Sequence, residues 1–137
     1  MNNSNQGLAS NVSYKRMKMI YVAGPYVGKD SDETEKNIER AEKASVELLK
    51  LGWVVVTPHK NTAHYEKYHP YLPYTYEFYL TRDFEIIKRC DAVFVLNNYI
   101  NSQGTLAEIN FCIENNVPYF FEEELHFPIP EDVEFRV

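Results

Sequence analysis

Two acidic residues, Asp83 and Glu108, stand where carboxylates could do chemistry. Asp83 falls on the apolar face of a predicted helix, where loss of water raises the pKa of a carboxyl group and suits it to act as a general acid. Glu108 follows within about one turn of the start of another predicted helix, whose dipole would hold the carboxylate ionised. A protonated and an ionised carboxylate at one crevice form the pair that cleaves a glycosidic bond through an oxocarbenium-like state.

Both acids also have structural explanations. Thr105-x-x-Glu108 fits a helix capping box, which requires no function. Asp83 could lie at the edge of its apolar face and bond to a loop. The spacing leaves these alternatives open.

Two loops could contact a ligand. The loop ending in Ser102, Gln103 and Gly104 leads into the helix of Glu108, and free N–H groups at a helix start attract anions such as phosphate. The first loop, at 24–28, is neither a G-x-G-x-x-G fingerprint nor a P-loop. Gly24 there either lets a ligand approach the backbone or forms a tight turn with the proline that follows it.

Histidine and cysteine give no metal signature. His59, His64 and His69 recur every five residues, which is not the i, i+4 spacing of a helical zinc pair. We therefore predict no metal, and expect these histidines at the surface or against a base. Two cysteines, Cys90 and Cys112, are too few for a disulfide scaffold and favour a reducing compartment. Cys112 is expected in the core.

The elements that must position these residues alternate along the chain. We predict strands at 19–23, 53–57, 91–96 and 117–121, and helices at about 33–51, 75–90 and 104–115. Continuous apolar strands separated by amphipathic helices are typical of parallel βαβ units. The fold expected is a Rossmann-like or flavodoxin-like α/β three-layer sandwich with a mainly parallel sheet of four to five strands. Ligands of such sheets bind outside the carboxyl ends of the strands.

The 137 residues suffice for one domain, which we place at 17–137 after a flexible leader at 1–16. With 45% hydrophobic and 25% charged residues, the chain is not disordered, collagen-like or a coiled coil. A net charge of −6 argues against nucleic acid polymers and membranes as partners. We see neither a spanning segment nor a signal peptide, expect a cytoplasmic location, and expect the acidic end to be solvated or packed on a partner subunit.

Several of these motifs together resemble one family. The opening Ile20-Tyr21-Val22-Ala23-Gly24-Pro25-Tyr26, Asp83, Cys90-Asp91-Ala92-Val93 and Ser102-x-Gly104-x-x-x-Glu108 are similar to motifs of the nucleoside 2-deoxyribosyltransferase family and of its 2′-deoxynucleoside 5′-monophosphate N-hydrolase relatives. The resemblance runs from Met19 to Phe121 and implies the same Rossmann-like fold.

The resemblance implies catalytic roles for three residues. Glu108 would attack C1′ of the deoxyribose and form a glycosyl-enzyme intermediate. Tyr21 would orient Glu108, and Asp83 would assist the departing base. The family needs no metal or organic cofactor.

It also implies substrate contacts and assembly. Ser102 and Gly104 match a loop that holds the 5′-phosphate in the hydrolases, and His59 matches a pocket histidine. Gly24 and Tyr26 of the first loop complete the expected substrate-binding set, and Lys29 is the candidate there for a phosphate-binding cation. A homodimer or larger homo-oligomer is expected.

We therefore predict an enzyme that cleaves or transfers at the N-glycosidic bond of 2′-deoxynucleosides or their 5′-monophosphates, with retention. Two alternatives stay open. One is a nucleotide-binding module that senses a ligand without catalysis. The other is a hydrolase of a ribonucleotide such as NAD.

Overall fold

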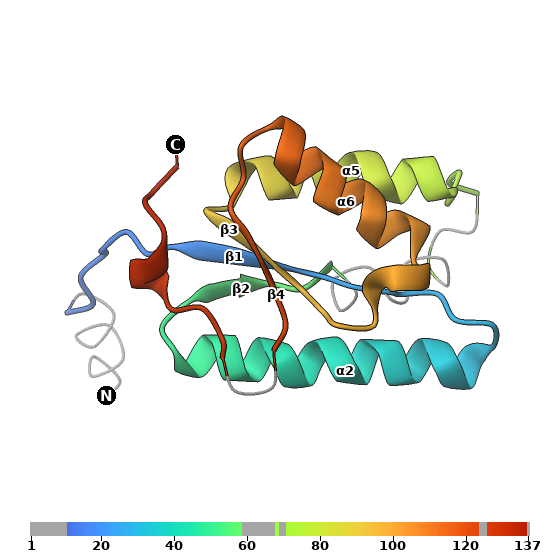
Figure 1. Cartoon of the computed structure of the whole chain (residues 1–137), viewed down its shortest axis with the longest axis horizontal. Coiled ribbons are helices and arrows are strands. Elements are labelled where there is room, and N and C mark those ends of the chain that lie inside the picture. Colours follow the sequence, from blue (N-terminus) through green and yellow to red (C-terminus); the bar gives the residue numbers. More distant parts are fainter. Residues whose placement is uncertain (1–10, 59–67, 69–70, 124–125, 137) are drawn as a thin grey trace, which may run out of the picture.

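The computed structural model describes residues 11–58, 68, 71–123 and 126–136 (Figure 1). Its elements follow one another as β1 (Met19–Ala23), α2 (Ser31–Lys50), β2 (Val54–Val56), α5 (Tyr76–Arg89), β3 (Ala92–Val95), η1 (Tyr99–Asn101), α6 (Gln103–Glu114), β4 (Tyr119–Phe121) and η2 (Pro130–Asp132). Residues 1–10 of the predicted leader, and His59, His64 and His69, lie outside the described residues.

The four described strands form one parallel sheet in the order β2-β1-β3-β4. Helix α2 covers one face of this sheet, and α5 and α6 cover the other (Figure 1). The predicted three-layer α/β sandwich is confirmed. Parallel pairing brings the carboxyl ends of β1 and β3 to one edge, with Tyr21 in register with Val93.

Alternation along β1 divides the core between the two faces. Ile20 and Val22 pack with Leu48 of α2, whereas Tyr21 packs with Ile87 of α5 and with residues of α6. All of these side chains are buried. Because side chains alternate across a strand, the tyrosine hydroxyl can reach only the layer that α5 and α6 form.

The helix ends follow local capping signals. The Asp30 side chain accepts from the Glu33 backbone N–H and starts α2 two residues earlier than predicted. Gly52 follows α2 with φ 105°, as predicted for a terminating glycine. Asn116 follows α6 with φ 55°, and Cys112 is buried as predicted.

The C-terminal segment has both exposed and buried side chains. The ring of Phe127 stacks on Phe94 with 5.1 Å between centroids, and Val133 is buried. The Trp53 indole N–H donates to the Pro128 carbonyl at 2.8 Å. The acidic residues of 126–136 are exposed, as the solvated alternative predicts, whereas apolar residues of the segment close the chain's own core on the α2 side.

Among the described residues, no helix combines the length and apolar character needed to cross a membrane.

Trp53→Phe is expected to lower the free energy of unfolding by about 1–3 kcal/mol, because the buried Pro128 carbonyl loses its donor. Urea denaturation followed by fluorescence or circular dichroism measures the change. Val46→Ala, on the exposed side of α2, is the matched control and should change stability by about 0.5 kcal/mol or less. Equal stability of the Trp53 variant and wild type would show that this hydrogen bond does not stabilise the packing of the segment.

Candidate active site

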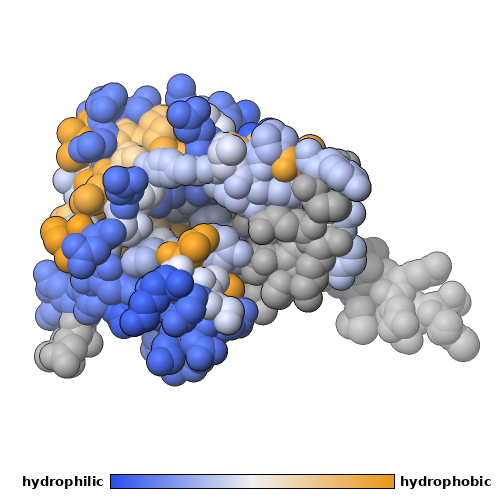
Figure 2. Space-filling model, turned by 90° about the vertical axis from the view of Figure 1, so that its right-hand side faces the viewer, coloured by the Kyte–Doolittle hydropathy of each residue, from blue (hydrophilic) through white to orange (hydrophobic). Residues whose placement is uncertain are grey.

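A cleft of about 1470 Å³ opens at the carboxyl ends of β1 and β3. Residues of α2, α5 and the start of α6 form its walls. Figure 2 looks onto this end of the molecule and shows a hollow bordered largely by hydrophilic residues. The cleft lies where the parallel sheet predicts a ligand site.

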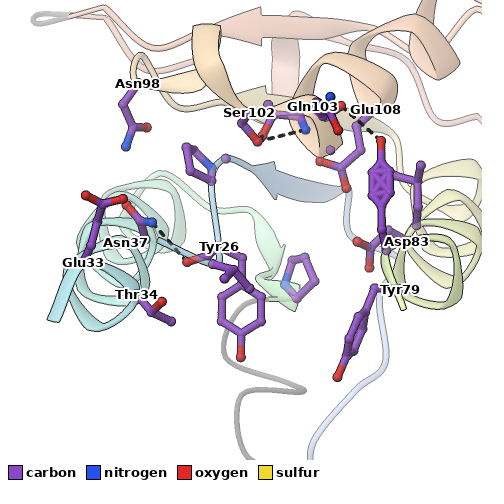
Figure 3. A pocket seen from close by; sticks show the side chains of 18 of the residues that line it. Tyr26, Glu33, Thr34, Asn37, Tyr79, Asp83, Asn98, Ser102, Gln103 and Glu108 are labelled. Carbon is purple, nitrogen blue, oxygen red and sulfur yellow. Dashed lines mark hydrogen bonds between the residues drawn. The ribbon is translucent and has the colours of Figure 1, made fainter. Parts of the chain in front are cut away.

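The three predicted catalytic residues line the base of this cleft together, and Figure 3 shows two of them, Asp83 and Glu108. The hydroxyl of Tyr21, from β1, donates a hydrogen bond to Oε2 of Glu108 in α6. Tyr21 is fully buried and Glu108 is 5% exposed. Asp83 reaches the same place from α5 and is partly buried. The structure thus assembles two carboxyl groups and a phenol from three elements.

Aromatic packing fixes the two helices that supply the acids. The ring of Phe84 in α5 stacks on Phe111 in α6, with 4.4 Å between centroids and 9° between planes. Each ring lies close in sequence to one acid, so this stacking holds Asp83 and Glu108 in relation to each other.

The protonation of Glu108 differs from the prediction. Burial raises the pKa of Glu108 well above its usual range, and repulsion by the Asp83 carboxylate raises it further, against the lowering effect of the Tyr21 hydrogen bond. Glu108 is the sixth residue of α6, beyond the first turn in which the helix dipole acts strongly. Loss of water therefore outweighs the dipole that was expected to keep it ionised.

Asp83 follows the predicted direction. Burial raises the pKa of Asp83 to about 6, although hydrogen bonding with Tyr21 and Glu108 favours its charged form. Among the described residues, its hydrogen-bond partners are thus the other site residues. The pKa of Tyr21 is raised by burial and by both neighbouring acids, so the phenol stays protonated and donates.

The capping alternative for Glu108 is wrong. Ser102 is the N-cap of α6, and its side chain accepts from the Thr105 backbone N–H at 3.2 Å. Its hydroxyl also lies 2.8 Å from the Thr105 hydroxyl. The Glu108 carboxylate accepts from the Tyr21 hydroxyl of β1 and does not bond back to the helix start, so it does not serve as a cap.

The two glycines predicted in the site have different surroundings. A Cβ on Gly24 would lie 2.6 Å from Cδ1 of Leu96, so this glycine permits close packing of the β1 end on β3. A Cβ on Gly104 would meet nothing within 4 Å. Both glycines line the cleft, but of the two only Gly104 has open space where a side chain would stand.

The remaining predicted contacts divide between the cleft and other places. Tyr26 and Ser102 line the cleft. Lys29 is exposed and is not among the described lining residues. His59 lies outside the described residues.

Sequence reasoning missed part of the wall. Tyr79, four residues before Asp83 on the same helix, lines the cleft, as does Asn37 of α2. The i, i+4 spacing from Asp83 could have found Tyr79. Asn98, in the loop after β3, also lines the cleft, as expected of a loop at the carboxyl end of a parallel strand.

In the described part of the chain, no three His, Cys, Asp or Glu residues gather as a metal site would require. The groups at the base of the cleft are suited to proton transfer and to covalent attack by a carboxylate.

Comparison with known proteins assigns the chain to a family. Residues 18–118 match the family described as Domain of unknown function (DUF4406), and the chain belongs to that family. Comparison with curated proteins gave no match.

A solved structure shares the fold. The 2-deoxyribosyltransferase of the psychrotolerant bacterium Bacillus psychrosaccharolyticus superposes with a TM-score of 0.53 and 24% identity, over 79% of this chain and 77% of the other. The likeness establishes that this chain has the deoxyribosyltransferase fold.

The buried acids make stability depend on pH. A carboxyl group whose pKa is raised on folding stabilises the protein fully at low pH, and this contribution is lost as the pH rises through the folded-state pKa. For Asp83 the window runs from about 4 to about 6. Asp83→Asn should therefore gain stability relative to wild type between pH 4 and pH 8, by on the order of 1 kcal/mol. If the free energies of unfolding of the two proteins, measured in urea, changed equally with pH, the result would contradict the burial of this charge.

Proposed function

We propose that this chain is an enzyme that cleaves or transfers at the N-glycosidic bond of 2′-deoxynucleosides or their 5′-monophosphates, with retention at C1′. The observation that carries the proposal is the buried group of Tyr21, Glu108 and Asp83 at the base of an open cleft. The deoxyribosyltransferase fold supports it. The fold neighbour is described as a biocatalyst for the synthesis of nucleosides, which are the substrate class proposed here.

In the first step, a carboxylate oxygen of Glu108 bonds to C1′ while the bond from C1′ to the base nitrogen breaks. The electron pair of that bond leaves with the base, and protonated Asp83 supplies a proton to the base. Positive charge developing on the sugar favours ionised Glu108 and moves the proton of the acid pair toward Asp83. The hydroxyl of Tyr21 orients the attacking carboxylate through its hydrogen bond.

In the second step, an acceptor attacks C1′ and the ester bond to Glu108 breaks. Ionised Asp83 takes the proton that the acceptor loses. Water as the acceptor makes the enzyme a hydrolase, and a second base makes it a transferase. The chemistry needs only proton transfer and a carboxylate nucleophile, so we propose no cofactor.

The cleft walls suit a nucleoside. Tyr26 and Tyr79 present aromatic rings on opposite sides of the space next to Asp83 (Figure 3). Flat rings of this kind can stack on a base. Gly24, Ser102 and Gly104 would contact the sugar side, and His59 is proposed as a further contact. We also propose a cytoplasmic homodimer or larger homo-oligomer.

Glu108→Gln should abolish release of free base, because the amide cannot form the glycosyl ester, while ligand binding persists. The assay incubates each of the four deoxynucleosides and their 5′-monophosphates with protein, with and without a second base, and separates the products by chromatography. Glu114→Gln, an exposed change on the same helix, should retain wild-type activity.

Other outcomes of this assay decide against the proposal. Ligand binding without turnover by wild type would indicate a sensing module. Cleavage of ribonucleotides in place of deoxyribonucleotides would indicate the NAD-type alternative.

Gly104→Ala should raise KM with little change in stability, because its new methyl group enters open space in the cleft. Gly24→Ala is the contrasting variant and should lower the melting temperature through its contact with Leu96. Steady-state kinetics and thermal unfolding measure both. An unchanged KM for the Gly104 variant would remove this part of the cleft from the substrate site.

A further inference from the structure

The cleft extends past the acid pair to a polar end on α2. Glu33, Thr34 and Asn37 line it there, opposite Asn98 from the β3 side (Figure 3). The mechanism proposed above uses none of these residues. Their chemistry therefore bears on the part of the substrate that does not react.

The positions of the acids orient a bound substrate. The leaving base must lie beside Asp83, which protonates it, and C1′ must lie against Glu108. The rest of the sugar, including C5′, then extends away from Asp83. In Figure 3, Asp83 and Glu108 lie on one side of the cleft and Glu33 lies on the other, with Ser102 between them.

The carboxylate of Glu33 is held in place. Its Oε1 accepts from the Lys29 backbone N–H at 3.1 Å. Its side chain packs on Gly28, since a Cβ there would lie 2.4 Å from the Cβ of Glu33. A fixed, partly buried negative charge therefore stands in the wall of this end of the cleft.

Nearby cations offset this charge incompletely. Arg40 also lines the cleft, but it forms an ion pair with Glu122 at 2.9 Å and a further hydrogen bond to Asn97. Lys36 lines the cleft from an exposed position, and acidic Glu35 lies next to it in the wall.

The start of α6 faces the same space, where its free N–H groups attract a hydroxyl oxygen as well as a phosphate. The charge of Glu33 opposes only the phosphate.

We propose that Glu33 is a specificity-determining residue that makes the site select 2′-deoxynucleosides with a free 5′-hydroxyl over their 5′-monophosphates. A carboxylate accepts a hydrogen bond from a hydroxyl group but repels a phosphate dianion. Asn98 supplies neutral polar groups at the same end. This inference rests on the proposed function for the direction in which the substrate lies.

The test compares each deoxynucleoside with its 5′-monophosphate, by kcat/KM for base release and by calorimetric titration of Glu108→Gln protein. Wild type should favour the nucleoside, and Glu33→Gln should shift the ratio toward the monophosphate by on the order of tenfold. Glutamine keeps the acceptor for the Lys29 N–H. Glu39→Gln, which removes a charge paired with Lys43 on the outer side of α2, is the matched control and should leave the ratio unchanged.

The outcomes separate this inference from the function it rests on. Faster cleavage of monophosphates by wild type, or an equal ratio in the Glu33 variant, would overturn the inference and leave the enzyme intact. Selective nucleoside binding without base release would overturn the enzyme and keep the selectivity. Binding of neither ligand at millimolar concentration would overturn both. Raising the salt concentration should weaken the discrimination, because the discrimination is electrostatic.

Discussion

The hydrogen bond between Tyr21 and Glu108 joins the inner strand β1 to helix α6, and both side chains are buried. A buried carboxyl group is tolerated only when hydrogen-bonded or protonated, and this one is adjacent to a second acid. The sheet, the stacked α5 and α6, and the glycine at the end of β1 together hold this group in position. Burial of two adjacent carboxyl groups destabilises the folded state, but it places them close enough to exchange one proton.

The parallel sheet makes that arrangement possible. Parallel strands bring their carboxyl ends to one edge, so residues far apart in the sequence converge there. Alternation along β1 then sends Tyr21 to one layer and its neighbours to the other. The hydrophobic core on the α2 side contains none of the three residues Tyr21, Asp83 and Glu108. That face of the sheet stabilises the fold, and the other face also holds the acids.

Much of the fold could be read from local patterns. Apolar runs and helical spacing predicted the positions of the strands and helices. Gly52 and Asn116 predicted where α2 and α6 end. The meeting of Tyr21 with Glu108 was expected only through family resemblance, because no local pattern links residues 87 positions apart. The protonation of Glu108 was mispredicted, since burial is a property of the assembled layers. Phe127 and Val133 lie beyond the last predicted strand, so no strand or helix pattern indicated that they complete the core.

The contacts of the C-terminal segment have a consequence for how the chain folds. Phe127 and Val133 complete the core on the α2 side from the segment that follows β4. Arg136 donates its backbone N–H to the Asp91 carboxylate, which also accepts from the Met19 backbone N–H at the start of β1. The first strand is therefore held by a residue far away in the sequence. Contacts of such long sequence separation carry a loop-closure entropy cost, which slows folding relative to a chain of the same size whose contacts are local.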